Sequence, residues 1–365
     1  MKILVSAING IGLGHVTRQL ALARALRERM PEAKFLFLTT SEAPGIIWQD
    51  GFASVKIPSW MNVTHGMLSK TEWLHLCHSL VSVTVANFRP NLLIADSFPQ
   101  GENGELLPAL STVPNRIFVY DFLPGHDAQK NHQQSIGLYN LVLIPYDEGA
   151  FQLPFNIKPA PHWIGPMIYR SRKEALPRAE ARRRLGIPED RLCFYVALGG
   201  GGGPETGETM AWLSDIARSF PELLFFQTMP PLASEKSGIL KADNARSISH
   251  FPLPFSPYLN AFDGAIAGAG ANTTTELIHL GLPAVWIPTG SKVAADQSWR
   301  AKNLADNGLG WNAERLDGEA LSKAIRGMLD ADVRREMREK MLAQPEPLGA
   351  QKGAEAIEKW LKSQN

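Results

Sequence analysis

Residues 268–283 read GAGANTTTELIHLGLP, and this stretch decides the fold class. A short apolar run ends in small residues just before it, and the apolar side chains between Thr273 and Leu280 recur with helical spacing. A strand that ends in a glycine-rich turn and continues as a helix is typical of a Rossmann-like βαβ unit. The first amides of such a helix have no intrahelical acceptor, so the turn is a candidate phosphate site.

The same alternation of short apolar runs and amphipathic helices extends outward through the chain, which predicts an α/β fold with parallel sheets. The expected strands are 3–7, 35–40, 92–96, 117–121, 192–198, 224–227, 265–267 and 284–288. The expected helices include 14–30, 205–220, 273–280 and a last amphipathic helix at 352–362.

The length of 365 residues exceeds what one hydrophobic core usually holds and indicates two domains. Turn residues followed by a basic stretch at 159–184 have the composition of a linker, and we place the boundary near Ile164. We therefore expect Rossmann-like domains at 1–163 and 164–345, facing each other across a cleft, and a C-terminal segment at 346–365.

Charge and cysteine usage exclude several classes of protein. The 37 basic and 36 acidic residues nearly cancel, which disfavours nucleic acid as a partner. Cys77 and Cys193 form no CxxC pair, as expected of structural thiols in a reducing cytoplasm.

No apolar run approaches the ~20 residues of a membrane span, and the apolar N-terminus is too short for a signal peptide. We expect a cytoplasmic protein without a transmembrane segment, either a monomer or a homodimer.

A second glycine-rich turn follows the first strand, where Gly10, Gly12 and Gly14 precede His15. A dinucleotide-binding enzyme would have the spacing G-x-G-x-x-G and an acidic residue after its second strand. Here the second strand ends in the letters TTS at 39–41, which argues against an NAD-dependent oxidoreductase.

His15 is the candidate general base. It lies at the start of the helix that follows the first strand, at the carboxyl edge of an open sheet, where such folds bind ligands. Asp96, at the end of strand 92–96, falls on the same edge and would hold the imidazole. Asp121 is the rival for this role, and packing or capping is the alternative role of His15 itself.

Two segments of the C-terminal half are candidate donor-binding elements. The five glycines at 199–203 end a strand and start a helix, so their amides could face a pyrophosphate, although such a run is also typical of a mobile loop. Glu276 falls near the end of the first turn of helix 273–280, where it could accept both ribose hydroxyls. The alternative is a capping box between Thr273 and Glu276.

The segment 268–288, followed by DQSWRA at 296–301 and NGLG at 307–310, resembles the donor-binding region of MurG-like and other UDP-sugar glycosyltransferases. GLGH at 12–15 resembles the N-terminal glycine-rich loop of the same family, and Asp96 resembles the aspartate that orients its base histidine. The resemblance implies a GT-B fold, with the acceptor bound by the N-terminal domain and the donor by the C-terminal domain. In that fold the last helix crosses back onto the N-terminal domain.

The resemblance also implies a role for each site residue. His15 and Asp96 would be catalytic, Glu276 would bind the ribose, and Asp296 with Gln297 would bind the sugar. The other residues expected to contact the donor are Gly14, Gly199, Gly200, Gly201, Gly270, Asn272 and Thr273. The implied reaction is an inverting, metal-independent and cofactor-free transfer of a hexosyl or N-acetylhexosaminyl group from a UDP-sugar or TDP-sugar to a small-molecule or lipid-linked acceptor.

The sequence departs from the lipid-acceptor enzymes in two places. The N-terminal loop has alternating single glycines rather than paired ones, and FPQGENGE at 98–105 is closer to an uncharacterised bacterial branch. A nucleotide-sugar hydrolase on the same scaffold and a non-catalytic nucleotide-sugar-binding protein are the alternatives to a transferase.

No motif of the sequence predicts a metal site. His75 and His78 have no third ligand at a suitable spacing, and Asp330 with Asp332 is interpreted as a solvated turn. The segment 57–88 is rich in aromatic and sulfur-containing side chains and is interpreted mainly as core, with the lining of an apolar acceptor pocket as a second interpretation.

Overall fold

The computed structural model describes residues 1–8, 13–121, 129–199, 206–229, 238–248, 254–288 and 295–364, without the side chains of 129–132, 206, 295 and 296. The chain divides into two compact units. The first unit consists of Met1–Tyr169 and Pro347–Asn365, and the second unit of Arg170–Glu346. The sequence-based boundaries, after residues 163 and 345, differ from these by a few residues.

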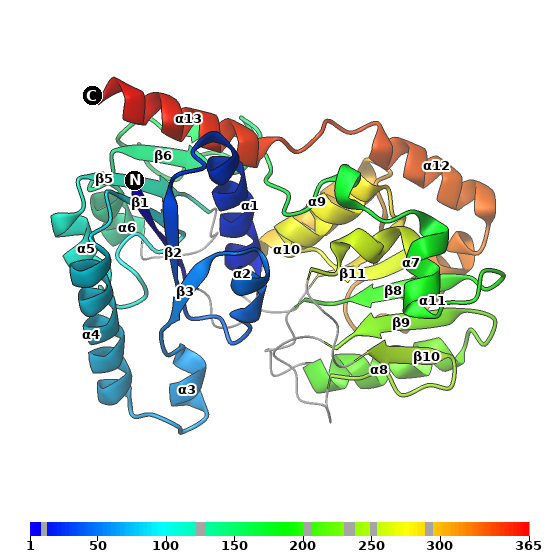
Figure 1. Cartoon of the computed structure of the whole chain (residues 1–365). Coiled ribbons are helices and arrows are strands. Elements are labelled where there is room, and N and C mark those ends of the chain that lie inside the picture. Colours follow the sequence, from blue (N-terminus) through cyan, green and yellow to red (C-terminus); the bar gives the residue numbers. More distant parts are fainter. Residues whose placement is uncertain are drawn as a thin grey trace. The chain divides into compact units, whose positions relative to one another are not determined.

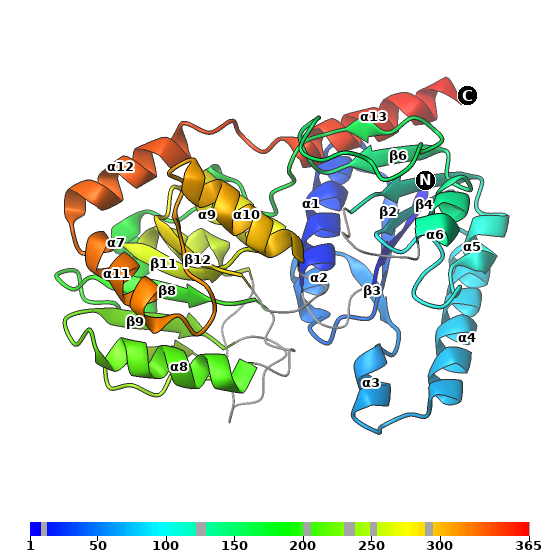
Figure 2. The ribbon, with the colours of Figure 1, turned by 180° about the vertical axis from the view of Figure 1, so that it is seen from behind.

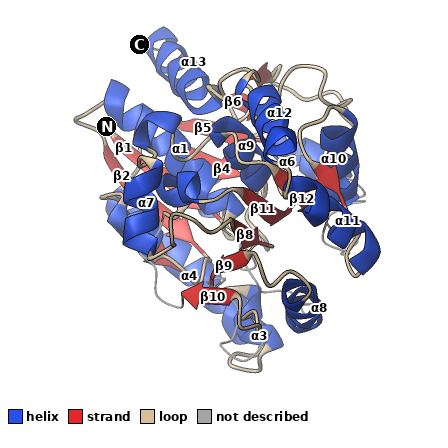
Figure 3. Cartoon of the chain, turned by 90° about the vertical axis from the view of Figure 1, so that its right-hand side faces the viewer, coloured by secondary structure: helices blue, strands red, loops and turns tan. Residues whose placement is uncertain are grey.

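The first unit is built on a seven-stranded sheet with the order β3-β2-β1-β4-β5-β6-β7 (Figures 1 and 3). All of its strand pairs are parallel. The strands are β1 (Lys2–Ala7), β2 (Lys34–Thr39), β3 (Ala53–Lys56), β4 (Leu92–Asp96), β5 (Asn115–Val119), β6 (Leu141–Ile144) and β7 (His162–Trp163). The order reverses direction between β1 and β4, which makes this point the topological switch where such sheets bind ligands.

Helices cover both faces of this sheet because the central strands are apolar on both sides. They are α1 (Gly14–Arg29), α2 (Gly45–Gln49), α3 (Trp60–Thr64), α4 (Lys70–Phe88), α5 (Leu107–Thr112), α6 (Gln129–Ile136) and α13 (Gly349–Ser363). Side chains of α4 and α5, such as Val81 and Leu110, pack with Leu93 and Phe118 in one buried cluster. Helices α1 and α13 lie on the other face (Figures 1 and 2).

The C-terminal helix α13 packs against α1 of the first unit, as predicted. Small residues permit this close approach. A side chain at Gly349 would place its Cβ 2.1 Å from the carbonyl oxygen of Gly165, and one at Gly353 would meet Leu22 at 3.2 Å. The ion pair between Arg29 and Glu358, 2.6 Å apart, also joins the two helices.

The second unit repeats the architecture with a six-stranded parallel sheet of order β10-β9-β8-β11-β12-β13. Its strands are β8 (Cys193–Ala197), β9 (Leu224–Thr228), β10 (Ala245–Ile248), β11 (Gly264–Gly268), β12 (Ala284–Ile287) and β13 (Trp311–Asn312). Its helices are η1 (Arg172–Glu174), α7 (Arg178–Leu185), α8 (Thr206–Arg218), η2 (Ser256–Ala261), α9 (Ala271–Leu280), α10 (Ala295–Asp306), α11 (Gly318–Met328) and α12 (Ala331–Leu342). One core cluster joins the sheet to α7, α9 and α12, and another joins it to α8 and α11.

The pair Asp330 and Asp332 begins a helix rather than forming a turn. Asp330 is the N-cap of α12, and its carboxylate accepts a hydrogen bond from the amide of Asp332 at 2.8 Å. Capping an otherwise unpaired helix amide accounts for an aspartate here. Among the helices of the described ranges, none combines the length and the hydropathy needed to cross a membrane.

Candidate active site

His15 lies in the first turn of α1, just beyond the carboxyl end of β1. Because β4 pairs directly with β1, the residues that follow the two strands meet at the switch point of the sheet. The His15 side chain is 14% exposed, so it is held by the protein and still reaches the surface. Its ring centroid is 6.3 Å from that of Phe98. Gly10 and Gly12 of the predicted turn lie outside the described residues.

Asp96 ends β4 and is buried directly beside His15. Its Oδ1 atom is 3.3 Å from Nδ1 of His15. The other oxygen, Oδ2, accepts hydrogen bonds from Nε of Arg18 at 3.0 Å and from Nε2 of Gln19 at 3.1 Å. The structure therefore brings the predicted pair His15 and Asp96 together.

Asp121, the alternative candidate for holding the imidazole, belongs to the same cluster through its hydrogen bond with Arg18. Its Oδ2 accepts a hydrogen bond from Nη2 of Arg18 at 3.1 Å, and its Oδ1 accepts one from the Tyr146 hydroxyl at 2.6 Å. Asp121 is thus linked to His15 through Arg18, whereas Asp96 faces the imidazole directly.

Arg18 is the residue at the centre of this site that sequence reasoning missed. Its side chain is 6% exposed, and its Nη2 atom lies 2.6 Å from Oδ1 of Asp96. A signal was present in the sequence. Arg18 lies among Val16, Gln19 and Leu20 on the buried side of α1, and a guanidinium at such a position needs buried acceptors.

Burial and charge oppose each other in this cluster. Burial tends to raise the pKa of Asp96, but the charges of Arg18 and His15 and their hydrogen bonds hold it well below its usual value. For Asp121 too, burial acts to raise the pKa, and the charges of Arg18 and His15 bring it below the usual range. Burial tends to lower the pKa of Arg18, and the two aspartates raise it well above its usual value. Both carboxylates and the guanidinium are therefore charged at neutral pH.

Ser97 also contacts His15, and it too was missed. Its hydroxyl lies 2.9 Å from Nδ1 of His15 and 2.7 Å from Oδ1 of Asp96. Ser97 has a φ of 62°, the left-handed conformation that residues other than glycine rarely adopt. Such backbone strain concentrates at functional sites.

The turn at 98–105 follows Ser97 and begins beside His15 with Phe98. Glu105 is buried, and its carboxylate accepts hydrogen bonds from the amides of Glu102 at 3.0 Å and Asn103 at 2.8 Å. Gly101 has a φ of 82°, and a Cβ there would lie 2.3 Å from the Glu105 carboxyl group. Glycine is therefore required for this carboxylate to enter the turn.

In the second unit, α9 begins two residues earlier than predicted, at Ala271. Gly270 is the N-cap, and among the described residues no side chain caps the helix. Thr273 and Glu276 therefore do not form a capping box, and Glu276 lies in the second turn rather than the first. Glycine has no side chain that could accept a hydrogen bond from these amides, and the first amides of a helix are positioned to bind a phosphate.

Glu276 is a partly buried carboxylate. Burial raises its pKa to about 7, and the Ser256 hydroxyl lowers it by less. Tyr195 lies close enough that burial and the Glu276 charge together raise its pKa to about 12. The Tyr195 hydroxyl is 3.1 Å from Oγ1 of Thr228. A carboxylate with this environment is suited to accept hydrogen bonds from neutral hydroxyl groups of a ligand.

The remaining predicted donor residues also lie in the second unit, except Gly14, which is the first residue of α1. Asn272 and Thr273 are in the first turn of α9, and Gln297 is in the first turn of α10. Arg300 of α10 donates a hydrogen bond to the carbonyl of Ala269 at 2.8 Å, which ties α10 to the start of α9. Gly199 follows β8 with a φ of 98°. Gly200, Gly201 and the side chain of Asp296 lie outside the described residues.

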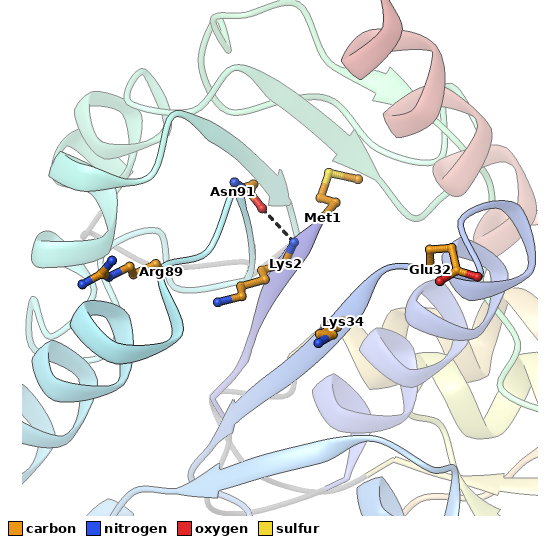
Figure 4. Close-up of a pocket in the computed structure, with 6 residues that line it drawn as sticks. All are labelled: Met1, Lys2, Glu32, Lys34, Arg89 and Asn91. Atoms are coloured by element: carbon orange, nitrogen blue, oxygen red, sulfur yellow. Dashed lines mark hydrogen bonds between the residues drawn. The ribbon is translucent and has the colours of Figure 1, made fainter.

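A cavity of about 380 Å³ lies at the opposite edge of the first sheet, where β1 and β2 begin (Figure 4). It is lined by Met1, Lys2, Glu32, Lys34, Arg89 and Asn91. None of the predicted site residues is among them, so this cavity is not part of the candidate active site.

His75 and His78 lie on α4 beside the buried Cys77. The Cys77 thiol donates to the carbonyl of Pro58 at 3.5 Å, and Nε2 of His78 is 3.1 Å from the carbonyl of Asn103. Within the described ranges, no group of three or more His, Cys, Asp or Glu side chains could hold a metal ion.

The segment 57–88 forms α3 and α4 and is only partly core. Trp73 is buried and packs edge-on against Trp60, with 5.0 Å between ring centroids. Trp60 and Met67 are 42% and 68% exposed. That this segment lines an acceptor pocket remains a prediction.

Part of the second unit and the end of the chain match the model of a known family. Residues 229–357 match the glycosyltransferase family 28 C-terminal domain. The chain is 27% identical over 312 residues to the UDP-N-acetylglucosamine--N-acetylmuramyl-(pentapeptide) pyrophosphoryl-undecaprenol N-acetylglucosamine transferase of Symbiobacterium thermophilum, covering 81% of this chain and 79% of that enzyme. The enzyme of the same name from Bacillus subtilis is 23% identical over 352 residues, with coverage of 92% and 93%.

Solved structures of glycosyltransferases are similar to this chain in fold. The spinosyn forosaminyltransferase SpnP aligns with a TM-score of 0.68 and 15% identity, covering 99% of each chain. MurG of Acinetobacter baumannii aligns with a TM-score of 0.61 and 16% identity, covering 98% of this chain and 99% of that one. These matches confirm the predicted GT-B fold and the resemblance to MurG-like glycosyltransferases.

Proposed function

We propose that this nucleotide-sugar glycosyltransferase, a divergent relative of the MurG-like enzymes, moves a hexosyl or N-acetylhexosaminyl group from a UDP-sugar to an acceptor hydroxyl with inversion and without a metal ion. The contact between His15 and the buried Asp96 carries this proposal, because it supplies a positioned base at the switch point of the first unit. The acceptor is a small molecule or a lipid-linked sugar, and the reaction takes place in the cytoplasm.

His15 would act on the acceptor as the general base. As the acceptor oxygen attacks the anomeric carbon, Nε2 of His15 takes the hydroxyl proton, and the bond between that carbon and the diphosphate oxygen breaks. The electron pair of this bond stays on the departing diphosphate. The cluster of Arg18, Asp96 and Asp121 carries one positive and two negative charges, so its net negative charge stabilises the imidazolium that forms.

The donor side belongs to α9 and α10. The amides at the start of α9, which follow the N-cap Gly270, would donate hydrogen bonds to the diphosphate, and the helix dipole favours the charge that grows on it as the sugar leaves. Glu276 would bind the ribose hydroxyls. Asp296 and Gln297, at the start of α10, would bind the sugar.

Glu276→Gln should weaken UDP binding by about ten- to a hundred-fold, because a charge-assisted pair of hydrogen bonds to the ribose contributes about 1.5–3 kcal/mol. Titration calorimetry at pH 8 measures this. Wild-type protein should bind UDP and give no measurable heat with NAD. Glu336→Gln, an exposed glutamate on α12, is the matched control and should bind UDP like wild type.

The same variant should be more stable than wild type at pH 8. The pKa of Glu276 in the folded protein, about 7, lies above its value in the unfolded chain. The free energy of unfolding of the wild type therefore falls as the pH rises from the unfolded pKa through the folded pKa. Glutamine has no charge to bury and removes this loss. A variant that is both less stable and weaker in UDP binding would instead assign Glu276 a structural role.

Chelation by EDTA should leave turnover within about two-fold of its untreated value, since the leaving diphosphate is bound by amides rather than by a metal ion. The assay measures release of UDP at saturating donor and acceptor before and after dialysis against the chelator. Activity that is lost on dialysis and returns with magnesium or manganese would contradict metal-independent transfer.

A further inference from the structure

We propose that Ser97 positions the base, so that Nδ1–H of His15 donates to the Ser97 hydroxyl and this hydroxyl donates to Asp96. This inference rests on the proposed function for its kinetic consequence, but the hydrogen-bond arrangement can be tested separately. Ser97 would be a positioning residue, since it touches the base and not the reacting atoms.

Arg18 has fewer hydrogens at Nη2 than the acceptors around that atom could use. Its Nη2 atom carries two hydrogens and can only donate. Within the described part of the chain it has four acceptors in reach: Asp96 Oδ1 at 2.6 Å, His15 Nδ1 at 3.0 Å, Asp121 Oδ2 at 3.1 Å and Ser97 Oγ at 3.1 Å. Hydrogen bonds to carboxylates are the stronger ones. Both hydrogens therefore go to the two aspartates, and neither is left for His15.

The hydroxyl of Ser97 then decides the tautomer of His15. Its single hydrogen has a charged acceptor at 2.7 Å, Oδ1 of Asp96. With that hydrogen used, the Ser97 oxygen can only accept from Nδ1, which lies 2.9 Å away. Nδ1 must then carry the imidazole proton, which leaves Nε2 unprotonated and able to take a proton from the acceptor.

The distances favour this path over a direct bond between His15 and Asp96. Nδ1 and Oδ1 are 3.3 Å apart, beyond the usual range of an N–H···O hydrogen bond, whereas both steps through Ser97 fall within the usual range. The role of Asp96 is then to orient Ser97 and to provide charge, with its own position fixed by Arg18 and Gln19.

The backbone of Ser97 supports the assignment. Its left-handed φ of 62° is retained although the residue has a Cβ, and its amide donates to the carbonyl of Val119 at 3.0 Å. Glycine would fit this conformation without strain. A strained serine at this position is accounted for by a requirement for its hydroxyl group.

No proton has to travel along the chain during catalysis. When Nε2 takes the proton of the acceptor, Nδ1–H remains bonded to Ser97, and the Ser97 hydrogen remains on its own oxygen. Among the residues that the structure describes, the charged groups that face the imidazole are Arg18 from α1, Asp96 from β4, Asp121 after β5 and Glu102 from the turn at 98–105.

Nitrogen-15 NMR of histidine-labelled protein tests the arrangement without an activity assay. The His15 signals are identified by their loss in His15→Ala. In neutral wild-type imidazole we expect the proton on Nδ1. Ser97→Ala and Ser97→Gly should both shift His15 toward the Nε2–H form. Ser214→Ala, which removes a buried hydroxyl from α8, is the matched control and should leave the His15 signals unchanged.

Kinetics provide the second readout. Both Ser97 variants should lower kcat by about ten- to a hundred-fold, the usual effect of losing a group that orients a catalytic side chain, and leave UDP affinity unchanged. Ser97→Gly should also melt at a higher temperature than Ser97→Ala, because it relieves the backbone strain. Equal losses of kcat in variants of unequal stability would assign the effect to the hydroxyl.

Three results would overturn the proposal: a proton on Nε2 in the wild type, an unchanged tautomer in both Ser97 variants, or wild-type kcat in both variants while His15→Ala is impaired. If the tautomer changes as expected and even His15→Ala keeps its turnover, the arrangement stands and the general-base role of His15 fails.

Discussion

Replacing His15 by alanine should lower kcat by about 10²- to 10⁴-fold, the usual contribution of a positioned general base. UDP affinity should stay within about two-fold of wild type, because the proposed donor-binding residues, apart from Gly14, lie in the other unit. Asp96→Asn should also lower kcat, since it removes the charge beside the imidazole and leaves the second unit unchanged.

Steady-state rates of UDP release and calorimetry with UDP measure the two quantities independently. His162→Ala, an exposed histidine of the same unit, is the matched control and should keep wild-type values. Turnover at the wild-type level in His15→Ala would remove His15 from the chemistry. Loss of UDP binding would instead place the nucleotide in the first unit and invert the proposed roles of the two domains.

Replacing Arg18 by methionine should lower the free energy of unfolding by about 3–5 kcal/mol, because it leaves buried carboxylates without their cation. Asp96 is almost fully buried, and Arg18 donates to it with both Nε and Nη2. Urea unfolding followed by circular dichroism measures the change. Arg29→Met, which removes a partly exposed ion pair with Glu358 from the same α1 helix, should cost at most about 1 kcal/mol.

In Arg18→Met the free energy of unfolding should change with pH in the opposite direction to that of the wild type. In wild type the pKa values of Asp96 and Asp121 are held below their unfolded values, so their contribution is complete above about pH 4 and is lost only as the pH falls further. Without Arg18, burial raises these pKa values. The free energy of unfolding of Arg18→Met should therefore increase as the pH is lowered from 7 to 5, whereas that of the wild type should not. Parallel pH profiles for the two proteins would contradict this account.

Local pattern was sufficient for the central elements of the fold. The apolar run at Leu92–Asp96 was assigned with the bounds that the structure shows, because a strand buried on both faces leaves a continuous apolar signal in the sequence. The strands β7 and β13 span two residues each and β3, β6 and β10 four residues each, and all five were missed. Such short strands are defined by pairing with a neighbour and carry no periodicity of their own.

Helix starts depend on signals of differing strength. The start of α9 was placed two residues late because Gly270, its N-cap, offers no side-chain hydrogen bond that a sequence could reveal. A glycine at this position is also what the proposed phosphate site would use, because it lets a ligand approach the first amides of the helix.

The sequence by itself determined that the chain folds into two α/β units, that His15 and Asp96 follow strands of one sheet, and that Glu276 lies on a helix after a glycine turn. Only the tertiary structure decided which groups surround His15. Arg18 is 78 residues from Asp96 and 103 from Asp121 along the chain, and their contact exists because β1 lies next to β4 in the sheet. Hydrophobic periodicity encodes which residues are buried, but not which strands become neighbours. Partners set by strand order are therefore invisible until the chain has folded.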